Sequence, residues 1–550
     1  MPDSAKQFNL IDSPWLLALT LDDRLTEISL GDAIVNASRY KQLVGEIPTQ
    51  VFAIERLVLA VLHRAVEGPQ DIRSWRAIRD SWDQMARLAL DYLDVFRDRF
   101  YLVHPSAPFF QVAGLHTAKN EWSGLEKLIT DVPNGAPYLT TRLASGLASI
   151  DFGEAARWLV HTQAFDTSGI RSGAVGDPRA KSGRGYPIGP GWAAQIGGVI
   201  LQGDSLVETL QLNLMALGTV QVRSGAGDLP PWERAPLSEQ EEVAGGRQPT
   251  GLVDLYTWQA RRIRLDHHDG KVTGLVLAQG DGMRPQNRQD VEPMSAWRFS
   301  DLQTKKLGGT TYMPRLHDPS REFWRGLSAL LPQVASNEGA KKPAPTLQPE
   351  LLRWVGILRA DGAIPDDQVI HVRAVGLVLG SKQSVVDEVV DDILSLPASI
   401  LNPGCADLVT QVLDAVERTD QAVRALASLA GNLAHAAGLD PKSMDPLDRA
   451  RERAYAALDA PFREWLVSLT SPEDSQASAT RWTSTARSVL WALSRDLVES
   501  VGPAAWKGRA VNQGNTKLHV DLGQADAWFR TKLSSALPRA QGNDQEVKSA

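Results

Sequence analysis

Hydrophobic residues recur at helical spacing throughout the part of the chain that follows Pro403. Four separate apolar stripes can be traced there, and polar or proline-containing links divide them. An apolar face repeating every three to four residues is typical of an amphipathic helix that packs against others. The stripes therefore predict a C-terminal four-helix bundle, with core positions at Val409–Leu433, Tyr455–Leu469, Trp482–Leu497 and Leu522–Leu537.

The first 400 residues mix two periodicities. Residues 48–65 repeat apolar side chains at helical spacing and predict a buried helix. Two short strands are expected within residues 8–36, followed by a helix that starts near Leu30. Further helices are expected at residues 85–102, 124–129, 152–164 and 205–217.

Alternation of apolar and polar residues appears in two places and predicts two β-hairpins. The first lies within residues 251–300 and turns at Asp269-Gly270, a dipeptide that favours tight hairpin turns. The second lies within residues 367–386 and turns near Gly380-Ser381. Together these patterns predict an α+β protein with a large mixed domain over residues 1–402 and the helical bundle over residues 403–550.

Composition describes an ordinary globular chain: 43% of the 550 residues are apolar and 22% are charged. A net charge of −7 argues against a protein that coats nucleic acid, although a local basic site remains compatible with it. The chain has no apolar run of about 18 residues and starts without a basic, then apolar, leader. We therefore expect a cytoplasmic protein with no membrane partner.

Motifs that would indicate catalysis or metal binding are missing from the sequence, which has no phosphate loop of the form GxxxxGK[ST], no HExxH and no CxxC. The dipeptides His268-Asp269 and His317-Asp318 resemble parts of metal-dependent phosphohydrolase sites, but a solvated turn is the favoured interpretation of the first. His63 and His104 are better explained as hydrogen-bonded structural residues. The single cysteine, Cys405, could act as a nucleophile, but its place just before a helix favours a structural residue. We expect no catalytic residue, metal or cofactor.

A glycine-rich segment at residues 169–191 is the most informative local feature. It carries four cations against one carboxylate, Asp177: Arg171, Arg179, Lys181 and Arg184. Glycines let the backbone approach a partner closely, and the charge of +3 suits the phosphates of a nucleic-acid backbone. A mobile surface loop is an equally good interpretation of this segment alone.

Residues 261–271, RRIRLDHHDGK, form a second candidate basic patch that ends at Lys271, beyond the predicted turn. For this patch alone, a charged hairpin exposed to water is the favoured interpretation.

The order of these segments resembles the CasA family, the large subunits of type I-E CRISPR Cascade complexes. The resemblance is carried by N-L-I-D-S-P-W at 9–15, the leucine-rich helix at 54–64, H-P-x-x-P-F-F-Q at 104–111 and G-L-E-K-L-I at 124–129. The glycine-rich segment, the helix at 205–214, a hairpin and the C-terminal bundle follow in the same order. The similarity thus extends over nearly the whole chain.

The resemblance implies a non-catalytic subunit that recognises the protospacer-adjacent motif of double-stranded DNA from the minor groove and starts strand separation. It implies contacts to that motif by Gly169, Gly173, Gly176, Lys271, Lys382 and Gln383, with Gln383 at the tip of a wedge hairpin over residues 377–386. It also implies a loop at roughly Tyr138–Ile150 that touches the guide end and the backbone of the complex, through Tyr138, Leu139 and Arg142. The implied partners are the guide RNA, the target DNA, the backbone, small and guide-end subunits of Cascade, and a helicase–nuclease. The family's cysteine-bound metal, present in some members, is impossible with Cys405 alone.

Two other hypotheses remain open at this stage. A nucleotide-using enzyme could hold phosphate in the 169–191 segment, but it would need a carboxylate pair and a base that the sequence does not display. A scaffold whose bundle only holds partners together would overlap with the first hypothesis.

Overall fold

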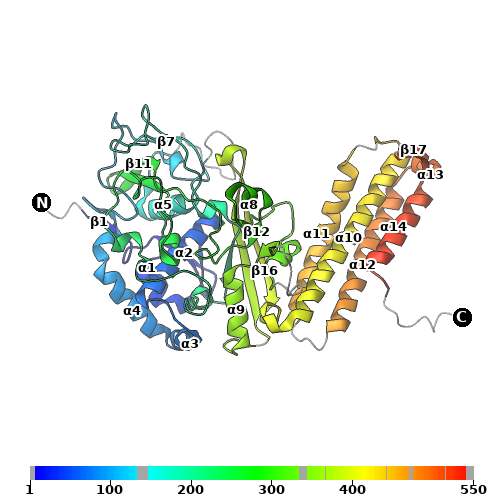
Figure 1. Cartoon of the computed structure of the whole chain (residues 1–550), viewed down its shortest axis with the longest axis horizontal. Helices are drawn as coiled ribbons and strands as arrows, with labels where there is room; N and C mark the ends of the chain where they lie inside the picture. Colours follow the sequence, from blue (N-terminus) through cyan, green and yellow to red (C-terminus); the bar gives the residue numbers. More distant parts are fainter. Residues whose placement is uncertain are drawn as a thin grey trace. The chain divides into compact units, whose positions relative to one another are not determined.

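The computed structural model describes residues 6–132, 147–332, 343–365, 367–440, 443–469, 475–513 and 516–539. The described residues divide into two compact units, whose segments can be found in Figure 1 by the colours of the residue-number bar. The first comprises those within Met1–Phe323, Ala335–Ile364 and Ile370–Leu394, and the second those within Trp324–Val334, Pro365–Val369 and Ser395–Ala550.

Helix α2 (Pro48–Ala65) forms the centre of the first unit and is buried along nearly its whole length. Helices α4 (Trp82–Val95), α5 (Phe152–Phe165) and α7 (Leu252–Tyr256) pack around it. Most of its buried side chains are apolar, and Thr49, Gln50, Glu55, Arg56 and His63 are buried with them. The unit's other helices are α1 (Leu30–Val35), α3 (Ile72–Asp80), α6 (Leu206–Asn213), α8 (Asp301–Leu307) and α9 (Glu350–Ala360).

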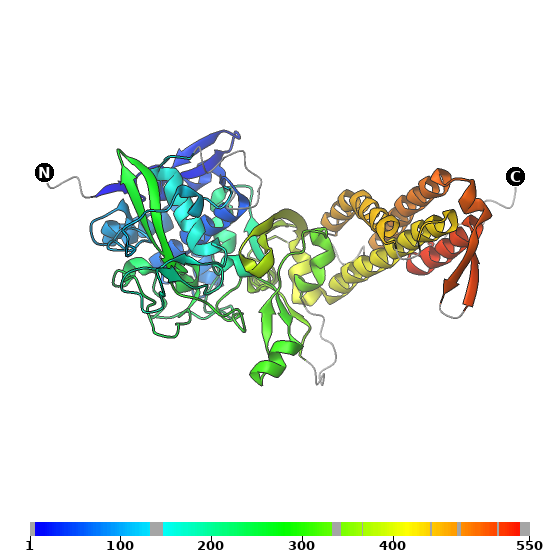
Figure 2. The same cartoon turned by 90° about the horizontal axis from the view of Figure 1, so that it is seen from above.

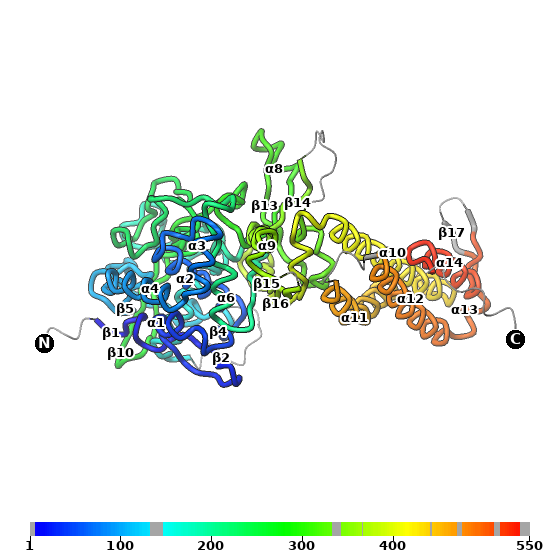
Figure 3. Tube along the Cα trace, turned by 90° about the horizontal axis from the view of Figure 1, so that it is seen from below, coloured from blue at the N-terminus to red at the C-terminus, as the bar shows by residue number. Residues whose placement is uncertain are grey.

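Several small sheets surround this helical centre. The paired strands are β1 (Gln7–Asn9) with β5 (Tyr101–Val103), and β2 (Leu16–Thr20) between β3 (Leu25–Ile28) and β4 (Tyr40–Val44). A further sheet has β12 (Trp297–Phe299) between β13 (Tyr312–Pro314) and β14 (Thr346–Leu347), with α8 beside it in Figure 3.

Two sheets carry the segments singled out by sequence. The first has the order β10 (Arg261–His268), β11 (Lys271–Gln279), β7 (Arg171–Ser172), β8 (Arg184–Gly185), with β6 (Ile150–Asp151) also paired to β11. The second has the order β16 (Val386–Pro397), β15 (Val369–Leu379), β9 (Gly198–Gln202). Figure 2 shows the long β10–β11 hairpin in green. Both predicted hairpins are therefore present, joined at Asp269-Gly270 and at residues 380–385.

The second unit is a helical bundle, and its long helices lie side by side in Figure 1. They are α10 (Ala406–Ala437), α11 (Asp445–Val467), α12 (Ser475–Ser500) and α14 (Leu522–Ala536). Tyr455, Phe462, Trp465 and Trp482 of the predicted stripes are buried in its core. The predicted α+β fold with a C-terminal four-helix bundle is confirmed. A short helix α13 (Pro503–Lys507) and a hairpin of β17 (Arg509–Gln513) and β18 (Thr516–Val520) precede the last long helix and were not predicted.

Helix ends differ from the sequence prediction where side chains bind the backbone. Helix α6 was expected to reach residue 217 but ends at Asn213, whose side-chain amide donates to the Leu201 carbonyl and accepts from the Leu201 amide. These bonds tie the chain to β9 and stop the helix. The second predicted helix ends at Val95 instead of residue 102, and the first 36 residues hold three short strands instead of two.

Among the described residues, no helix combines the length and the apolar composition that crossing a bilayer requires.

Candidate nucleic-acid interface

The glycine-rich segment is folded back on itself as a short antiparallel ribbon. Arg171 pairs with Gly185 and Ser172 with Arg184. At the end of the ribbon, Lys181 and Arg184 exchange backbone hydrogen bonds of 2.9 and 3.0 Å around Ser182 and Gly183, which have φ values of 51° and 71°. Two successive positive φ angles are the mark of a type I′ turn. We call these paired strands and their turn the ribbon; most other residues of the segment form turns and loop.

Close packing within the ribbon accounts for Gly173. A Cβ at this position would lie 2.5 Å from the carbonyl carbon of Gly183, on the strand opposite. At Gly169 and Gly176 the nearest atoms belong to the side chains of Arg171 and Glu239. Glycine at 173 thus serves the segment's own fold, and its presence is not in itself a sign of a bound partner.

Arg171 points into the protein and is neutralised there. Its guanidinium binds Asp166 at 2.8 and 3.0 Å, and the buried Arg261 binds the same carboxylate. Burial alone would raise the pKa of Asp166, but the charges of Arg261 and Arg171 outweigh it and hold that pKa below its usual value.

Arg179 is also neutralised. It forms ion pairs with Asp177 at 3.0 Å and Glu241 at 3.2 Å, and it donates to the carbonyls of Gln279 and Gly280. Ion pairs thus neutralise two of the four cations, so less than the local charge of +3 counted from the sequence is available to a partner. Lys181 and Arg184 are exposed, and no ion pair to either is found in the described part of the chain.

The second predicted element is the β15–β16 hairpin, and the tip of this hairpin contacts the start of the glycine-rich segment. The tip residues Lys382 and Gln383 are exposed and have φ values of 54° and 57°. Residues other than glycine rarely adopt such backbone angles, which cost of order 1–3 kcal/mol each. The Gln383 carbonyl accepts a 2.8 Å hydrogen bond from the amide of Ser168, immediately before Gly169. The structure thus brings the start of the glycine-rich segment and the hairpin tip together.

Lys271 lies elsewhere. It follows the type I′ turn at Asp269-Gly270 and pairs with Asp151, whereas the ribbon pairs with β11 at Ala278. Seven residues of strand separate the two positions, or about 23 Å at the usual rise per residue. The structure does not bring Lys271 to the ribbon–hairpin contact.

Comparison with known proteins agrees with this architecture. The family model described as CRISPR-associated protein Cse1 matches residues 9–493. This chain belongs to the Cse1 family. A curated relative from Thermus thermophilus, CRISPR-associated protein CasA/Cse1, is 30% identical over 550 residues, covering 96% of this chain and all of the relative.

Solved structures extend the match to three dimensions. The crystal structure of Thermobifida fusca Cse1 is 41% identical, with a TM-score of 0.88 over 98% of this chain and 99% of that one. Cse1 from Acidimicrobium ferrooxidans is 27% identical, with a TM-score of 0.80 over 96% and 98% of the two chains. A chain in a structure titled "CRISPR RNA-guided surveillance complex" shares the fold, with a TM-score of 0.64 at 18% identity over 96% of this chain and 99% of that one.

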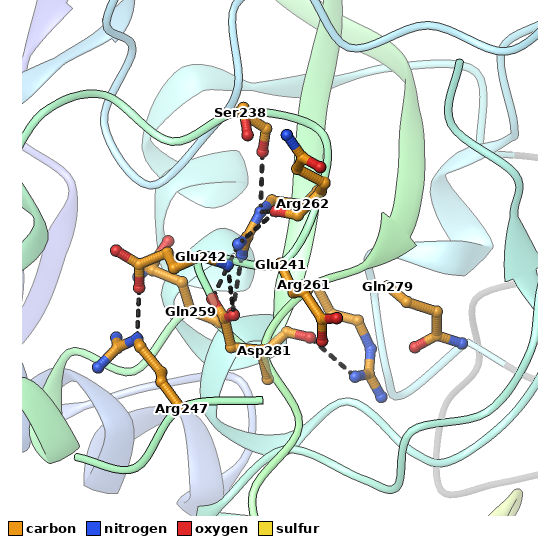
Figure 4. Close-up of polar contacts among 12 residues, drawn as sticks. Ser238, Glu241, Glu242, Arg247, Gln259, Arg261, Arg262, Gln279 and Asp281 are labelled. Carbon is orange, nitrogen blue, oxygen red and sulfur yellow. Dashed lines mark hydrogen bonds and ion pairs between the residues drawn. The ribbon is translucent and has the colours of Figure 1, made fainter. Parts of the chain in front are cut away.

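In this Cse1-family chain, the basic patch predicted at residues 261–271 is largely absent. Arg261 and Arg262 are 1% and 0% exposed. Arg262 binds the equally buried Asp281 at 2.8 Å and donates to the carbonyls of Ser238 and Gln259, as Figure 4 shows. Asp281 in turn accepts from the amide of Glu242. The pair is an internal brace that fixes the segment around Ser238–Glu242 on the sheet.

Three histidines that the sequence analysis considered lie in different surroundings. His268 lies at the exposed turn with its Nε2 3.2 Å from an Asp269 carboxylate oxygen, as the solvated-turn interpretation predicts. His104 is hydrogen-bonded, as predicted: its Nδ1 accepts from the amide of Ala107 and its Nε2 lies 3.1 Å from Asp98. The prediction of a hydrogen-bonded residue is wrong for His63, which is buried without a hydrogen-bond partner among the described residues, and burial lowers its pKa to about 3.

No group of three or more His, Cys, Asp or Glu residues that could hold a metal ion is found in the ranges the structure describes. Cys405 is half-buried and directly precedes α10. The predicted guide-RNA contacts Tyr138, Leu139 and Arg142 lie outside the described residues.

Sequence reasoning missed the residues that position the ribbon. Asp166 holds Arg171, and the Gln279 side chain donates to the carbonyls of Gly169 and Gly185 at 2.8 and 3.3 Å. The available signal was the pair of arginines opening β10, since charged residues within a buried strand require carboxylate partners somewhere in the fold.

Proposed function

We propose that this chain is the large, non-catalytic subunit of an RNA-guided CRISPR surveillance complex, that it recognises the motif beside the target in duplex DNA, and that it starts strand separation. Membership of the Cse1 family supports the assignment to such a complex. The observation that carries the DNA-reading role is the hydrogen bond between the Ser168 amide and the Gln383 carbonyl, because it unites the two elements that the role requires.

The exposed cations provide the phosphate contacts in this proposal. Lys181 and Arg184 lie on the ribbon and Lys382 on the hairpin tip. Arg171 and Arg179 are excluded from direct contact because their guanidiniums are held by carboxylates. A few exposed cations at one place are compatible with a net charge of −7, since phosphate attraction at short range depends on the local charge.

Gly169, Gly176, Lys382 and Gln383 form the proposed motif contact in the minor groove, whereas Gly173 is buried against Gly183 and is left out of it. That groove presents similar acceptors for most base pairs, so close backbone approach and a few donors read it loosely. The complex should therefore tolerate several related motifs.

Gln383 acts as the wedge in this proposal. Its side chain is exposed while its backbone is fixed by the bonds to Ser168 and Gly380. Unstacking a base step costs a few kcal/mol, and pairing of the guide with the target strand is nearly balanced against the duplex it replaces. A rigid tip that lowers the cost of the first step is sufficient to start the exchange.

We place Lys271 at a separate DNA contact, because it lies at the far end of β11. A lysine about 23 Å along β11 from the point where the ribbon pairs would meet the DNA backbone away from the motif. Lys271→Ala should then weaken binding to all duplexes equally, whereas a selective loss of motif discrimination would return Lys271 to the motif contact.

Guide-end binding through Tyr138, Leu139 and Arg142, and recruitment of the helicase–nuclease, complete the proposal by analogy with the family. The alternative, an enzyme that holds a nucleotide phosphate in the 169–191 segment, gains no support from Arg171 and Arg179, since both already bind carboxylates.

Co-purification from the host tests the proposal directly. A tagged full-length chain should bring with it a short guide RNA and several protein partners, and the assembly should bind duplex DNA that carries a matching target and motif. A chain that purifies without RNA, or an assembly indifferent to the target sequence, would contradict the proposal.

A further inference from the structure

Two exposed apolar residues flank the paired strands at the base of the ribbon. Ile170 is 53% exposed and Tyr186 is 52% exposed. The ribbon's register pairs Arg171 with Gly185, and continuing it by one residue sets Ile170 opposite Tyr186. Directly opposed residues of an antiparallel pair project to the same side, so the two side chains are neighbours.

The alternation of side chains along the two strands shows that Ile170 and Tyr186 lie on the outward side of the ribbon. Arg171 and Gly185 face inward, the first bound to Asp166 and the second packed against Gln279. Because successive side chains point to opposite sides, Ile170, Ser172, Arg184 and Tyr186 share the outward side. We call these four residues the ribbon face.

The ribbon face is held rigidly and lies beside the hairpin tip. Gln279 binds the carbonyls of Gly169 and Gly185, which precede Ile170 and Tyr186 respectively. The Ser168–Gln383 hydrogen bond is two residues from Ile170. An aromatic ring on a fixed backbone loses little conformational freedom on binding, so it makes a good contact surface.

The charges around this face favour an anionic partner. Arg184 is part of the face and Lys181 adjoins it in the turn, and neither forms an ion pair within the described residues. Of the nearby carboxylates, Asp166 and Asp177 are each occupied by an arginine. Glu239 lies beside Gly176, and Asp387 lies beside Gly380 at the hairpin. The face therefore joins an aromatic ring, an aliphatic side chain and a guanidinium.

We propose that the ribbon face binds an unpaired nucleobase of the separated DNA, stacked on Tyr186 and Ile170 with its phosphate on Arg184. Flat base faces stack on aromatic rings, and cations beside the ring hold the backbone. Bases within a duplex already stack on their neighbours, so the face selects the opened strand. The inference rests on the proposed function and adds to it a device that traps the first base released at the wedge.

The test uses the assembly that co-purifies with the full-length chain and two DNA probes. One is a fully paired duplex, and the other is the same duplex with a short unpaired fork that carries 2-aminopurine at its first open position. Tyr186→Ala should weaken binding to the fork by roughly 5- to 100-fold, leave the paired duplex within about two-fold, and abolish the fluorescence quenching of 2-aminopurine. Tyr186→Phe keeps the ring and should behave like the wild type, whereas Ile170→Ala should show a smaller loss on the fork alone.

Trp506→Ala provides the matched control, because Trp506 is also aromatic and 65% exposed but lies in the second unit. It should change neither probe. Equal loss on both probes for Tyr186→Ala, or no loss on either, would overturn the inference while leaving the proposed function intact. Loss of a protein partner by Tyr186→Ala with normal fork binding would reassign the face to a protein contact. Failure of the wild-type assembly to bind either probe would instead remove the proposed function.

Discussion

At the scale of single residues, the four cations of the glycine-rich segment differ in whether a carboxylate of the protein neutralises their charge. Arg171 is 13% exposed in its side chain and shares Asp166 with Arg261. Lys181 and Arg184 are exposed. Two arginines of the same segment thus have different roles: Arg171 stabilises the ribbon, and Arg184 is available to a partner.

Substitution of these two arginines should give opposite results. Arg171→Ala should lower the free energy of unfolding by about 1–3 kcal/mol, because Asp166 loses one of its two partners in a buried place. Arg184→Ala should leave stability unchanged but reduce the slope of log affinity for duplex DNA against log salt concentration by about 0.9, the value of one phosphate contact. Urea unfolding and binding titrations at several salt concentrations measure the two effects. Equal destabilisation by both variants would contradict the distinction.

The wedge residue can be tested without disturbing the hairpin. Gln383→Ala keeps the backbone carbonyl that binds Ser168 and removes only the exposed amide side chain. We expect slower R-loop formation on relaxed, linear target and little change in the first encounter with the motif, since the side chain acts after docking. Stopped-flow measurement of strand opening separates the two steps.

Gln84→Ala, at an exposed position of α4, is the matched control for that measurement and should be silent. Normal opening rates for Gln383→Ala on relaxed DNA would remove Gln383 from the wedge role.

At the scale of elements, sequence patterns succeeded where the determinant is local. The Asp269-Gly270 turn and the bundle stripes depend on neighbouring residues, and both were predicted. The predicted basic patch was wrong at Arg261 and Arg262, because their neutralising partners Asp166 and Asp281 are distant in sequence and meet the arginines only in the folded protein. The same limit applies to the site. The glycine-rich segment and the hairpin were each recognised from sequence, but their contact through Ser168 and the remote position of Lys271 depend on the tertiary fold.

Helix α2 carries a buried acid that should make the first unit sensitive to pH. Glu55 is 4% exposed, and burial raises its pKa from 4.5 to about 7, partly opposed by Arg373 of β15 and assisted by Asp391 of β16. The folded protein therefore holds the proton more tightly than the unfolded chain. The contribution of Glu55 to stability is complete below pH 4.5 and is lost as the pH rises to about 7.

The expected loss over that interval is about 3 kcal/mol, at roughly 1.4 kcal/mol for each unit of pKa difference. Glu55→Gln should abolish it, because the amide does not titrate. Urea unfolding of both proteins between pH 4.5 and 8 measures the difference, and Glu27→Gln, at an exposed position, is the control. Parallel curves for the wild type and Glu55→Gln would show that Glu55 does not titrate in this range.

At the scale of the whole molecule, the chain order does not follow the two units. The second unit includes Trp324–Val334, which precede two segments of the first unit, Ala335–Ile364 and Ile370–Leu394. Trp324 is fully buried there: its ring stacks on Phe462 at 4.2 Å between ring centroids, and its Nε1 donates to Asp459 at 3.0 Å. The bundle core is thus completed by a residue that a cut at 402/403, the domain boundary expected from sequence, would remove.

Trp324→Ala in the full-length chain should therefore destabilise the bundle by about 3–5 kcal/mol, as for other buried aromatic residues, although the substitution lies outside the four helices. The near-ultraviolet circular dichroism of the stacked aromatic residues and the urea midpoint of the bundle's unfolding should both change. Trp506→Ala removes an exposed tryptophan of the same unit and should leave the midpoint in place. If the bundle unfolds at the same urea midpoint with and without Trp324, the stability of its four helices does not depend on this residue. The stretch from Trp324 to Val334 would then be an accessory to the bundle and not part of its core.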